Sequence, residues 1–301
     1  RFERRELSLP VGTLTLAILP GFSASVSAQI EPWLTTAATA AARVTGRLAD
    51  ERVLAVVVPE RASSDPVHFG MATRGGGSAL LLLVASNAEL AELRKDWVAV
   101  HELCHLLHPF VARDQAWLSE GLATYYQEVL RVRAGLLPER EAWRRIYEGS
   151  LRGRDTAGSL AQASAKASES HDFPTIYWAG AAFALMADVE LRKRSAGKRS
   201  LDDVMAGLSS CCARGERPQP AEAVLARMDE LAGTPVFSEL AERWVHGPKL
   251  PELGPLYTQL GLRVAKGKVE ESASAEHAWI RAAIMSGQKE AEQTGSREVG
   301  R

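Results

Sequence analysis

The sequence predicts an α+β fold, with a mixed α/β lobe at the N-terminus and an all-helical lobe after it. Segments typical of strands alternate with helical ones only up to about residue 110. From residue 115 onward the chain is almost wholly helical in pattern, and it contains no internal repeat. The stretch "HELCHLL", residues 101–107, lies at the boundary between the two parts.

In the N-terminal part, period-2 alternation and short apolar runs predict the strands, and apolar residues at helical spacing predict the helices. The strand segments are 6–19, read as one or two strands, then 52–60, and 68–85, read as a strand pair around a glycine turn or one strand that glycine interrupts. The helical segments are 27–48 and 87–108, the second with Asn87 as its N-cap.

The C-terminal part is predicted to contain helices at 115–134, 138–150, 175–194, 200–209, 219–232 and 236–246. Residues 152–174 are polar and small and read as a long loop, with a helix in "LAQASAKA" as the alternative. Residues 250–269 read as an irregular closing piece with a strand, and the tail after about 285 as disordered. The expected organisation is therefore 1–110, 111–248 and 249–301.

Composition excludes several classes of protein. The formal net charge is -1, which indicates neither a nucleic-acid nor a polyanion partner. The longest apolar runs, such as "SALLLLVAS", are far shorter than the roughly 20 residues of a membrane span. No partner protein is evident, and a soluble protein is expected. Because the chain begins at Arg1, the sequence leaves open whether a leader peptide has been removed. A periplasmic or secreted location is open for the same reason.

The three cysteines are Cys104, Cys211 and Cys212. The last two are adjacent, and a disulfide between neighbours is not expected because its geometry is strained. No spaced CxxC pair is present, so the cysteines predict neither a disulfide scaffold nor a zinc knuckle.

His101 and His105 are four residues apart, which places both imidazoles on one face of a helix, about one turn from each other. Both can therefore donate a ring nitrogen to one metal ion. Glu102 is rotated away from that face and can reach a metal-activated water without being a ligand. This arrangement of two ligands and one general base is what the HExxH motif describes. The motif alone is a weak signal, because a surface helix can also carry it.

Two observations disfavour a surface helix. The residues around the histidines are apolar, so this helix is expected to be buried, and buried histidines need partners. A catalytic zinc site also needs a third protein ligand. Glu120 lies in the otherwise apolar stretch "AWLSEGLATYYQEVL", where an acid on a core-facing helix needs a cation, so it is the candidate.

HExxH followed by "WLSEGLATYYQ" resembles the gluzincin zinc metallopeptidases, which have a zincin, thermolysin-like catalytic unit. The segments "IYWAGAAFALMADVELRKRSAGKRSLDDVMAGL" and "FSELAERWVHGPKLPELGPLYTQLGL" resemble the glycyl-aminopeptidase branch. The resemblance spans roughly residues 85 to 265. It implies one zinc per chain, held by His101, His105 and Glu120, and a peptide or protein substrate hydrolysed with Glu102 as general base.

The same resemblance gives Tyr177 a role as hydrogen-bond donor to the oxyanion. From the residues alone, Tyr177 is interpreted as a packing residue, because an aromatic at a helix start is most often one. The branch's lysine of Tyr-x-Lys-Gly is Ala179 here, and the strand region "MATRGGGSALLLL" lacks the glutamate with which aminopeptidases bind a free amine. Endo- and aminopeptidase activity therefore both stay open. So do a gluzincin-fold binding protein that has lost catalysis and a zinc hydrolase of a non-peptide substrate.

Three more residues are left with alternatives. His108 falls on the face of the two histidines and is read either as a capping group for the helix C-terminus or as a ligand of an atypical site. Thr124, four residues after Glu120, is read as a hydrogen-bond partner of a ligand or as a packed side chain. His171 is the candidate for contact with substrate among the other histidines.

Overall fold

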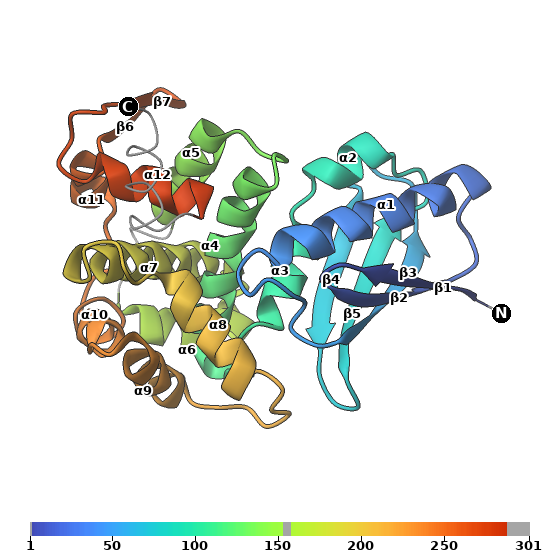
Figure 1. Cartoon of the computed structure of the whole chain (residues 1–301), viewed down its shortest axis with the longest axis horizontal. Helices are drawn as coiled ribbons and strands as arrows, with labels where there is room; N and C mark the ends of the chain where they lie inside the picture. Colours follow the sequence, from blue (N-terminus) through green and yellow to red (C-terminus); the bar gives the residue numbers. More distant parts are fainter. Residues whose placement is uncertain (1, 153–157, 288–301) are drawn as a thin grey trace, which may run out of the picture.

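Two lobes are visible in the computed structural model, which describes residues 2–152 and 158–287. Figure 1 shows a sheet lobe, a helical lobe, and helix α3 between them. This confirms the predicted α/β N-terminal lobe followed by a helical lobe. Most of the tail that was predicted to be disordered lies outside the described residues. Within the described part of the chain, no helix combines the length and apolarity that a membrane span needs.

The N-terminal lobe is built on a five-stranded sheet with strand order β1-β2-β3-β5-β4. Strands β2 and β3 pair in parallel, because α1 connects them, and β3 and β5 also pair in parallel, with β4 between them in the chain. The pairs β1–β2 and β4–β5 are antiparallel hairpins. The two hairpins agree with the predicted strand pairs. The strands are β1 (Glu3–Leu9), β2 (Gly12–Ile18), β3 (Arg52–Glu60), β4 (Val67–Thr73) and β5 (Ser78–Ala85). Strand β4 is an edge strand, so one side of its backbone is free of sheet pairing.

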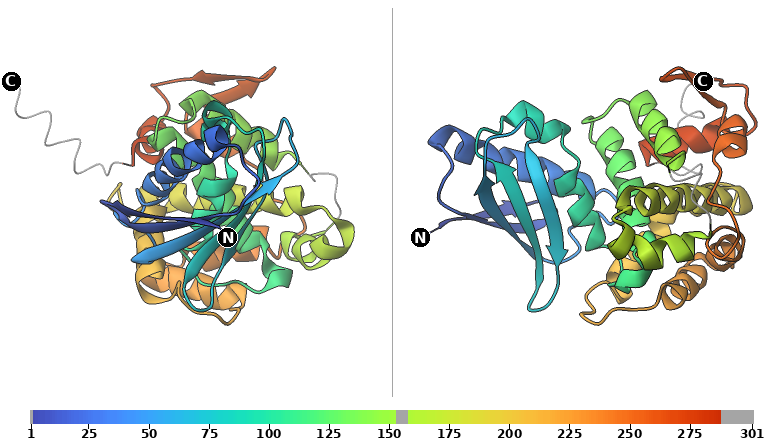
Figure 2. Two further views of the ribbon diagram at one scale, coloured as in Figure 1. Left: turned by 90° about the vertical axis from the view of Figure 1, so that its right-hand side faces the viewer. Right: turned by 180° about the vertical axis from the view of Figure 1, so that it is seen from behind.

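Helix α1 (Ala24–Ala41) crosses one face of the sheet, as Figure 2 shows from two sides. It begins and ends earlier than the predicted 27–48. The predicted single helix 87–108 is wrong, because the chain forms α2 (Leu90–Lys95) and α3 (Val98–His105). Asp96 breaks it: its backbone is extended, and its carboxylate accepts a hydrogen bond from the Val98 amide at 2.7 Å. Asn87 is not the N-cap either, because its side chain accepts from the Ser63 amide.

Helices form the second lobe, in close agreement with the predicted segments. They are the 3₁₀ turn η1 (Arg113–Gln115), α4 (Trp117–Arg133), α5 (Glu139–Ser150), α6 (Leu160–Ser170), α7 (Phe173–Arg194), α8 (Leu201–Cys211), α9 (Ala221–Ala232) and α10 (Val236–Trp244). Helix α6 is the predicted alternative to a long loop in this region. It begins with a capping box between Ser159 and Gln162. The closing segment contains α11 (Gly254–Gln259), the hairpin β6 (Leu262–Ala265) and β7 (Lys268–Glu271), and α12 (Ala278–Ser286), a helix that was not predicted.

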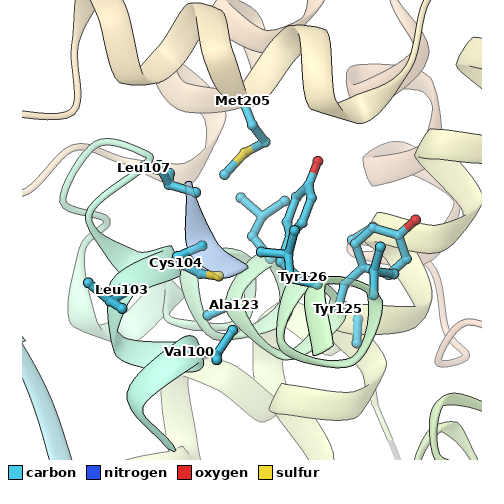
Figure 3. Close-up of a cluster of buried hydrophobic side chains, with 14 of the residues drawn as sticks. Val100, Leu103, Cys104, Leu107, Ala123, Tyr125, Tyr126 and Met205 are labelled. Atoms are coloured by element: carbon cyan, nitrogen blue, oxygen red, sulfur yellow. The ribbon is translucent and has the colours of Figure 1, made fainter. Parts of the chain in front are cut away.

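The apolar faces of α3 and α4 hold these two helices against each other and against α8. Figure 3 shows this cluster, which includes Val100, Leu103, Leu107, Ala123, Tyr126 and Met205. Cys104 belongs to it and is fully buried, in agreement with a packing role. Because this face of α3 is anchored in the core, the opposite face, which carries His101 and His105, is held in a fixed position.

The end of α8 contradicts one expectation from the sequence. Cys211 and Cys212 form a disulfide, with their Cα atoms 3.8 Å apart. The adjacent cysteines can meet because the helix ends between them, and Cys212 leaves the helical conformation with φ -142°.

Two glycines allow α4 and α7 to cross with their backbones in contact. A Cβ atom on Gly121 would lie 2.4 Å from the backbone of Gly180, and one on Gly180 would lie 2.2 Å from the carbonyl oxygen of Trp117. No side chain fits at this crossing. Because Gly121 follows Glu120 and Gly180 is one turn beyond Tyr177, the close crossing brings Glu120 and Tyr177 to the same place.

Substitution of Gly121 by alanine should therefore destabilise the protein. The added methyl group meets backbone atoms that cannot rotate away, and such overpacking costs about 1–3 kcal/mol of unfolding free energy. Urea unfolding of Gly121→Ala measures it. The matched control is Gly207→Ala in α8, where the new Cβ meets only the end of the Leu231 side chain. An equal loss of stability in both variants would contradict the importance of the crossing.

Candidate metal centre

Three side chains from two helices converge at the boundary between the lobes. His101 and His105 come from α3, and Glu120 comes from the first turn of α4. The Nε2 atom of His101 lies 3.1 Å from Nε2 of His105 and 3.1 Å from Oε2 of Glu120, and the His105–Glu120 distance is 3.4 Å. Among the residues that the structure describes, these three form the one group of metal-binding side chains brought within ligand distance.

The spacing of these atoms fits a tetrahedral zinc ion. With bonds of about 2.0–2.2 Å, neighbouring ligand atoms of a tetrahedral site lie about 3.3–3.6 Å apart. Gln127, on α4, accepts a hydrogen bond from Nδ1 of His101 at 2.7 Å, and its own amide group donates to Glu128 at 3.0 Å. Nδ1 of His101 therefore carries the proton, and its Nε2 faces Glu120 as a bare lone pair. A lone pair that faces a carboxylate needs a cation between them, either a proton or a metal ion.

The pKa shifts of Glu120 and His105 also favour a metal ion at this cluster. Burial opposes ionisation of Glu120, but the neighbouring His105 and His101 hold the pKa of its carboxyl well below the usual range. Burial lowers the pKa of His105, and the Glu120 carboxylate more than reverses this, so that the net pKa is raised. A carboxylate that stays ionised in a buried place is a suitable ligand for a metal ion.

Glu102 lies beside this cluster and not in it. Its Oε2 accepts a hydrogen bond from the Ala72 amide of β4 at 2.7 Å, so the edge strand fixes the carboxylate. Gly70 allows the strand to come this close, because a Cβ atom there would lie 2.4 Å from Val98 and 2.7 Å from Glu102. Glu102 is 7% exposed and lines a cleft of about 270 Å³ together with His105, Glu120 and β4.

Tyr177 reaches the same cleft from the start of α7. Its ring stacks on that of His101 with a centroid distance of 5.9 Å and an interplanar angle of 21°. Burial and then the charge of Glu120 raise the pKa of the Tyr177 phenol, so its hydroxyl keeps its proton at neutral pH and remains a hydrogen-bond donor.

The C-terminal end of α3 is held by Arg74, from the turn after β4. Its guanidinium donates to the carbonyl oxygens of His105, His108 and Ala213, the last at 3.2 Å. His108 is buried, and its Nδ1 donates to the Pro109 carbonyl at 2.8 Å. Burial, with the nearby His105 and Arg74, lowers the pKa of His108 to about 3, so this imidazole is neutral.

Glu102, His105, Glu120 and Tyr177 line one cleft, and His101 joins His105 and Glu120 in the metal-binding group. His108 also lines the cleft but lies outside the metal-binding group, and the Thr124 hydroxyl has no hydrogen-bond partner in the described part of the chain. His171 is elsewhere, as the exposed C-cap of α6.

Sequence reasoning missed Gln127 and Arg74. Gln127 could have been found, because it lies seven residues after Glu120 and so on the same face of α4. Arg74 gives no such signal, because only the fold brings its turn to α3.

A family model described as M61 glycyl aminopeptidase matches residues 106–184, a segment that contains Glu120 and Tyr177 and begins just after His105. No curated protein matches at a significant level.

Several solved structures share the fold. An aminopeptidase N family protein from Idiomarina loihiensis has 16% identity and a TM-score of 0.68, over 88% of this chain and 50% of that one. An M1 zinc metallopeptidase from Deinococcus radiodurans has 18% identity and a TM-score of 0.57, over 84% and 53%. Legionella pneumophila aminopeptidase A, in complex with aspartic acid, has 15% identity and a TM-score of 0.55, over 82% and 28%.

At these identities the solved structures establish the fold, and this chain spans about half of their length or less. With the matched segment, they confirm the predicted resemblance to gluzincin zinc metallopeptidases of the glycyl-aminopeptidase-like branch. The predicted two-lobe architecture is confirmed as well, and zinc is the metal of this class of enzyme.

Proposed function

We propose that this chain hydrolyses peptide bonds as a zinc-dependent peptidase, with His101, His105 and Glu120 as the zinc ligands. The observation that carries the proposal is the convergence of their three donor atoms at 3.1–3.4 Å beside a carboxylate that is not one of them. Zinc held there would lower the pKa of a water molecule and polarise the scissile carbonyl.

The proton transfers fall to Glu102. Its carboxylate takes a proton from the attacking water and passes it to the leaving nitrogen, which is general base and then general acid catalysis. The Ala72 amide holds Oε2 of Glu102 in place, and the Glu102 side chain lines the cleft. Tyr177 keeps its hydroxyl proton and donates it in a hydrogen bond to the oxygen that becomes negative as the carbonyl carbon turns tetrahedral.

The substrate is proposed to lie along the free edge of β4. The amide of Ala72 points away from β5 and is taken by Glu102. The carbonyl of Ala72 and the backbone groups of Gly70 lie on the same free side of β4, where an extended peptide can pair with them. Strand β4 carries no carboxylate that could bind a free amine. The proposed function therefore includes endopeptidase activity as well as aminopeptidase activity.

Digestion of a mixed peptide library, with and without a chelator, tests the proposed function. We expect cleavage that the chelator abolishes and that added zinc restores. Zinc binding without cleavage of any peptide would favour the two rivals, a binding protein that has lost catalysis or a hydrolase of non-peptide substrates. Cleavage that continues after complete removal of the metal would contradict the proposal.

Gln127 should contribute to zinc affinity, because its side-chain oxygen fixes the proton on the far nitrogen of His101. Loss of such a partner typically lowers metal affinity about 10–100-fold. We expect this loss in Gln127→Leu, measured by competition with a zinc-binding dye. The exposed Gln259→Leu in α11 is the control and should bind zinc like the native protein. Unchanged affinity of Gln127→Leu would contradict the assigned tautomer.

A further inference from the structure

A second cavity of about 610 Å³ opens beside the proposed site, on the other side of Tyr177 from the β4 cleft. Tyr177 lines both spaces. Three aromatic side chains, Trp97, Phe173 and Trp178, contribute to its walls, and Thr124, Gln127 and Glu128 line it from α4. Nothing in the proposed mechanism uses this cavity.

The α4 side of the cavity contains two buried polar atoms without partners. The Oγ1 atom of Thr124 and the Oε2 atom of Glu128 have no hydrogen-bond partner within the described ranges, and their residues are only 2% and 1% exposed. A buried polar atom left unpaired costs free energy, so these atoms favour a ligand that donates a hydrogen bond. Both can accept one, and a carboxylate oxygen can do nothing else.

The charge around Glu128 selects a neutral donor over a cation. Oε1 of Glu128 faces the equally buried Arg131 at 3.5 Å, so the pair has no net charge. Arg152 stands over the ring of Trp178 at 5.9 Å and adds a positive charge. The other two arginines that line the cavity, Arg144 and Arg145, are paired with Glu141, and Arg144 also with Glu148. A lysine or arginine of the substrate would meet more positive than negative charge here.

The distances along α4 set the length of the ligand. Thr124 and Glu128 follow Glu120 by four and eight residues, which is about 6 Å and 12 Å along a helix. A side chain that begins next to the metal-binding group must therefore be long to reach Glu128. Aromatic walls favour an aromatic side chain, because rings pack well in edge-to-face or offset contacts.

We propose that this cavity is a side-chain subsite next to the metal centre and that it takes a tyrosine side chain of the substrate. The ring lies among Trp97, Phe173 and Trp178. The phenolic hydroxyl donates a hydrogen bond to the Glu128 carboxylate and accepts one from the Thr124 hydroxyl. The inference rests on the proposed function, because it names the substrate class of the same site.

Matched peptides that differ only in tyrosine or phenylalanine, placed first on one side of the scissile bond and then on the other, test the subsite. On one of the two sides we expect kcat/KM to be roughly ten- to hundred-fold higher for tyrosine, the usual range for a hydrogen bond to a charged group. Glu128→Gln and the isosteric Thr124→Val should each reduce this ratio. Glu239→Gln on the surface of α10 is the control and should leave it unchanged. Equal rates for tyrosine and phenylalanine on both sides of the bond, or a preference for lysine or arginine, would each overturn the inference.

Binding of tyrosinamide and phenylalaninamide to the metal-free protein, measured by calorimetry, separates the two proposals. If no peptide is cleaved but tyrosinamide binds more tightly and Thr124→Val removes the difference, the subsite stands and the peptidase fails. If peptides are cleaved without discrimination and neither amide binds preferentially, the peptidase stands and the subsite fails. Thr124→Val also keeps the test decisive if Glu128→Gln does not fold.

Discussion

Glu102→Gln should retain zinc and lose roughly 10²–10⁴-fold in kcat, the usual contribution of a general acid–base group. The amide oxygen of glutamine can still accept the hydrogen bond from Ala72, so the side chain should keep its place against β4. The amide cannot take up a proton, and for this reason the loss should appear in the chemical step alone. Steady-state kinetics with zinc analysis of the same sample measures both quantities.

The control for Glu102→Gln is Glu239→Gln, an identical chemical change on an exposed helix face. It should behave like the native protein in both measurements. Full activity of Glu102→Gln would mean that another group activates the water. Loss of zinc in this variant would mean that Glu102 supports the ligands directly.

Tyr177→Phe should lower kcat and kcat/KM together by roughly a hundred- to thousand-fold, or about 2.7–4 kcal/mol, as expected for a lost oxyanion donor. Its hydroxyl acts only when charge develops on the substrate oxygen, so KM should change little. Phenylalanine keeps the stacking on His101 and the contact with Phe173, so packing is preserved. Near-normal kcat with normal zinc content would leave Tyr177 a packing residue and remove it from the site.

The helical spacing of His101 and His105 was sufficient to place both imidazoles on one face, because i and i+4 positions of a helix always share one. The acid in the apolar stretch of α4 was likewise visible in the sequence. By contrast, the break at Asp96 was not, since the apolar periodicity continues through it. A local hydrogen bond from Val98 to the Asp96 side chain decides the conformation there.

Other features of the candidate site depend on contacts between distant segments. Ala72 and Glu102 are hydrogen-bonded although they are 30 residues apart in the sequence. Arg74, next to a glycine turn, donates to carbonyl groups at the C-terminal end of α3. The cavity beside Tyr177 combines side chains of α4, α5 and α7. No periodicity encodes these approaches, because the sheet register and the glycine crossing of α4 and α7 create them.

Zinc content after dialysis against metal-free buffer tests the central claim most directly, when the native protein is compared with His105→Ala. The native chain should retain about one zinc, bound through three protein ligands with one open position. His105→Ala should lose it, because two of the three donor atoms do not complete the site. A native protein that holds no zinc, or a variant that keeps its full content, would contradict the ligand set of His101, His105 and Glu120.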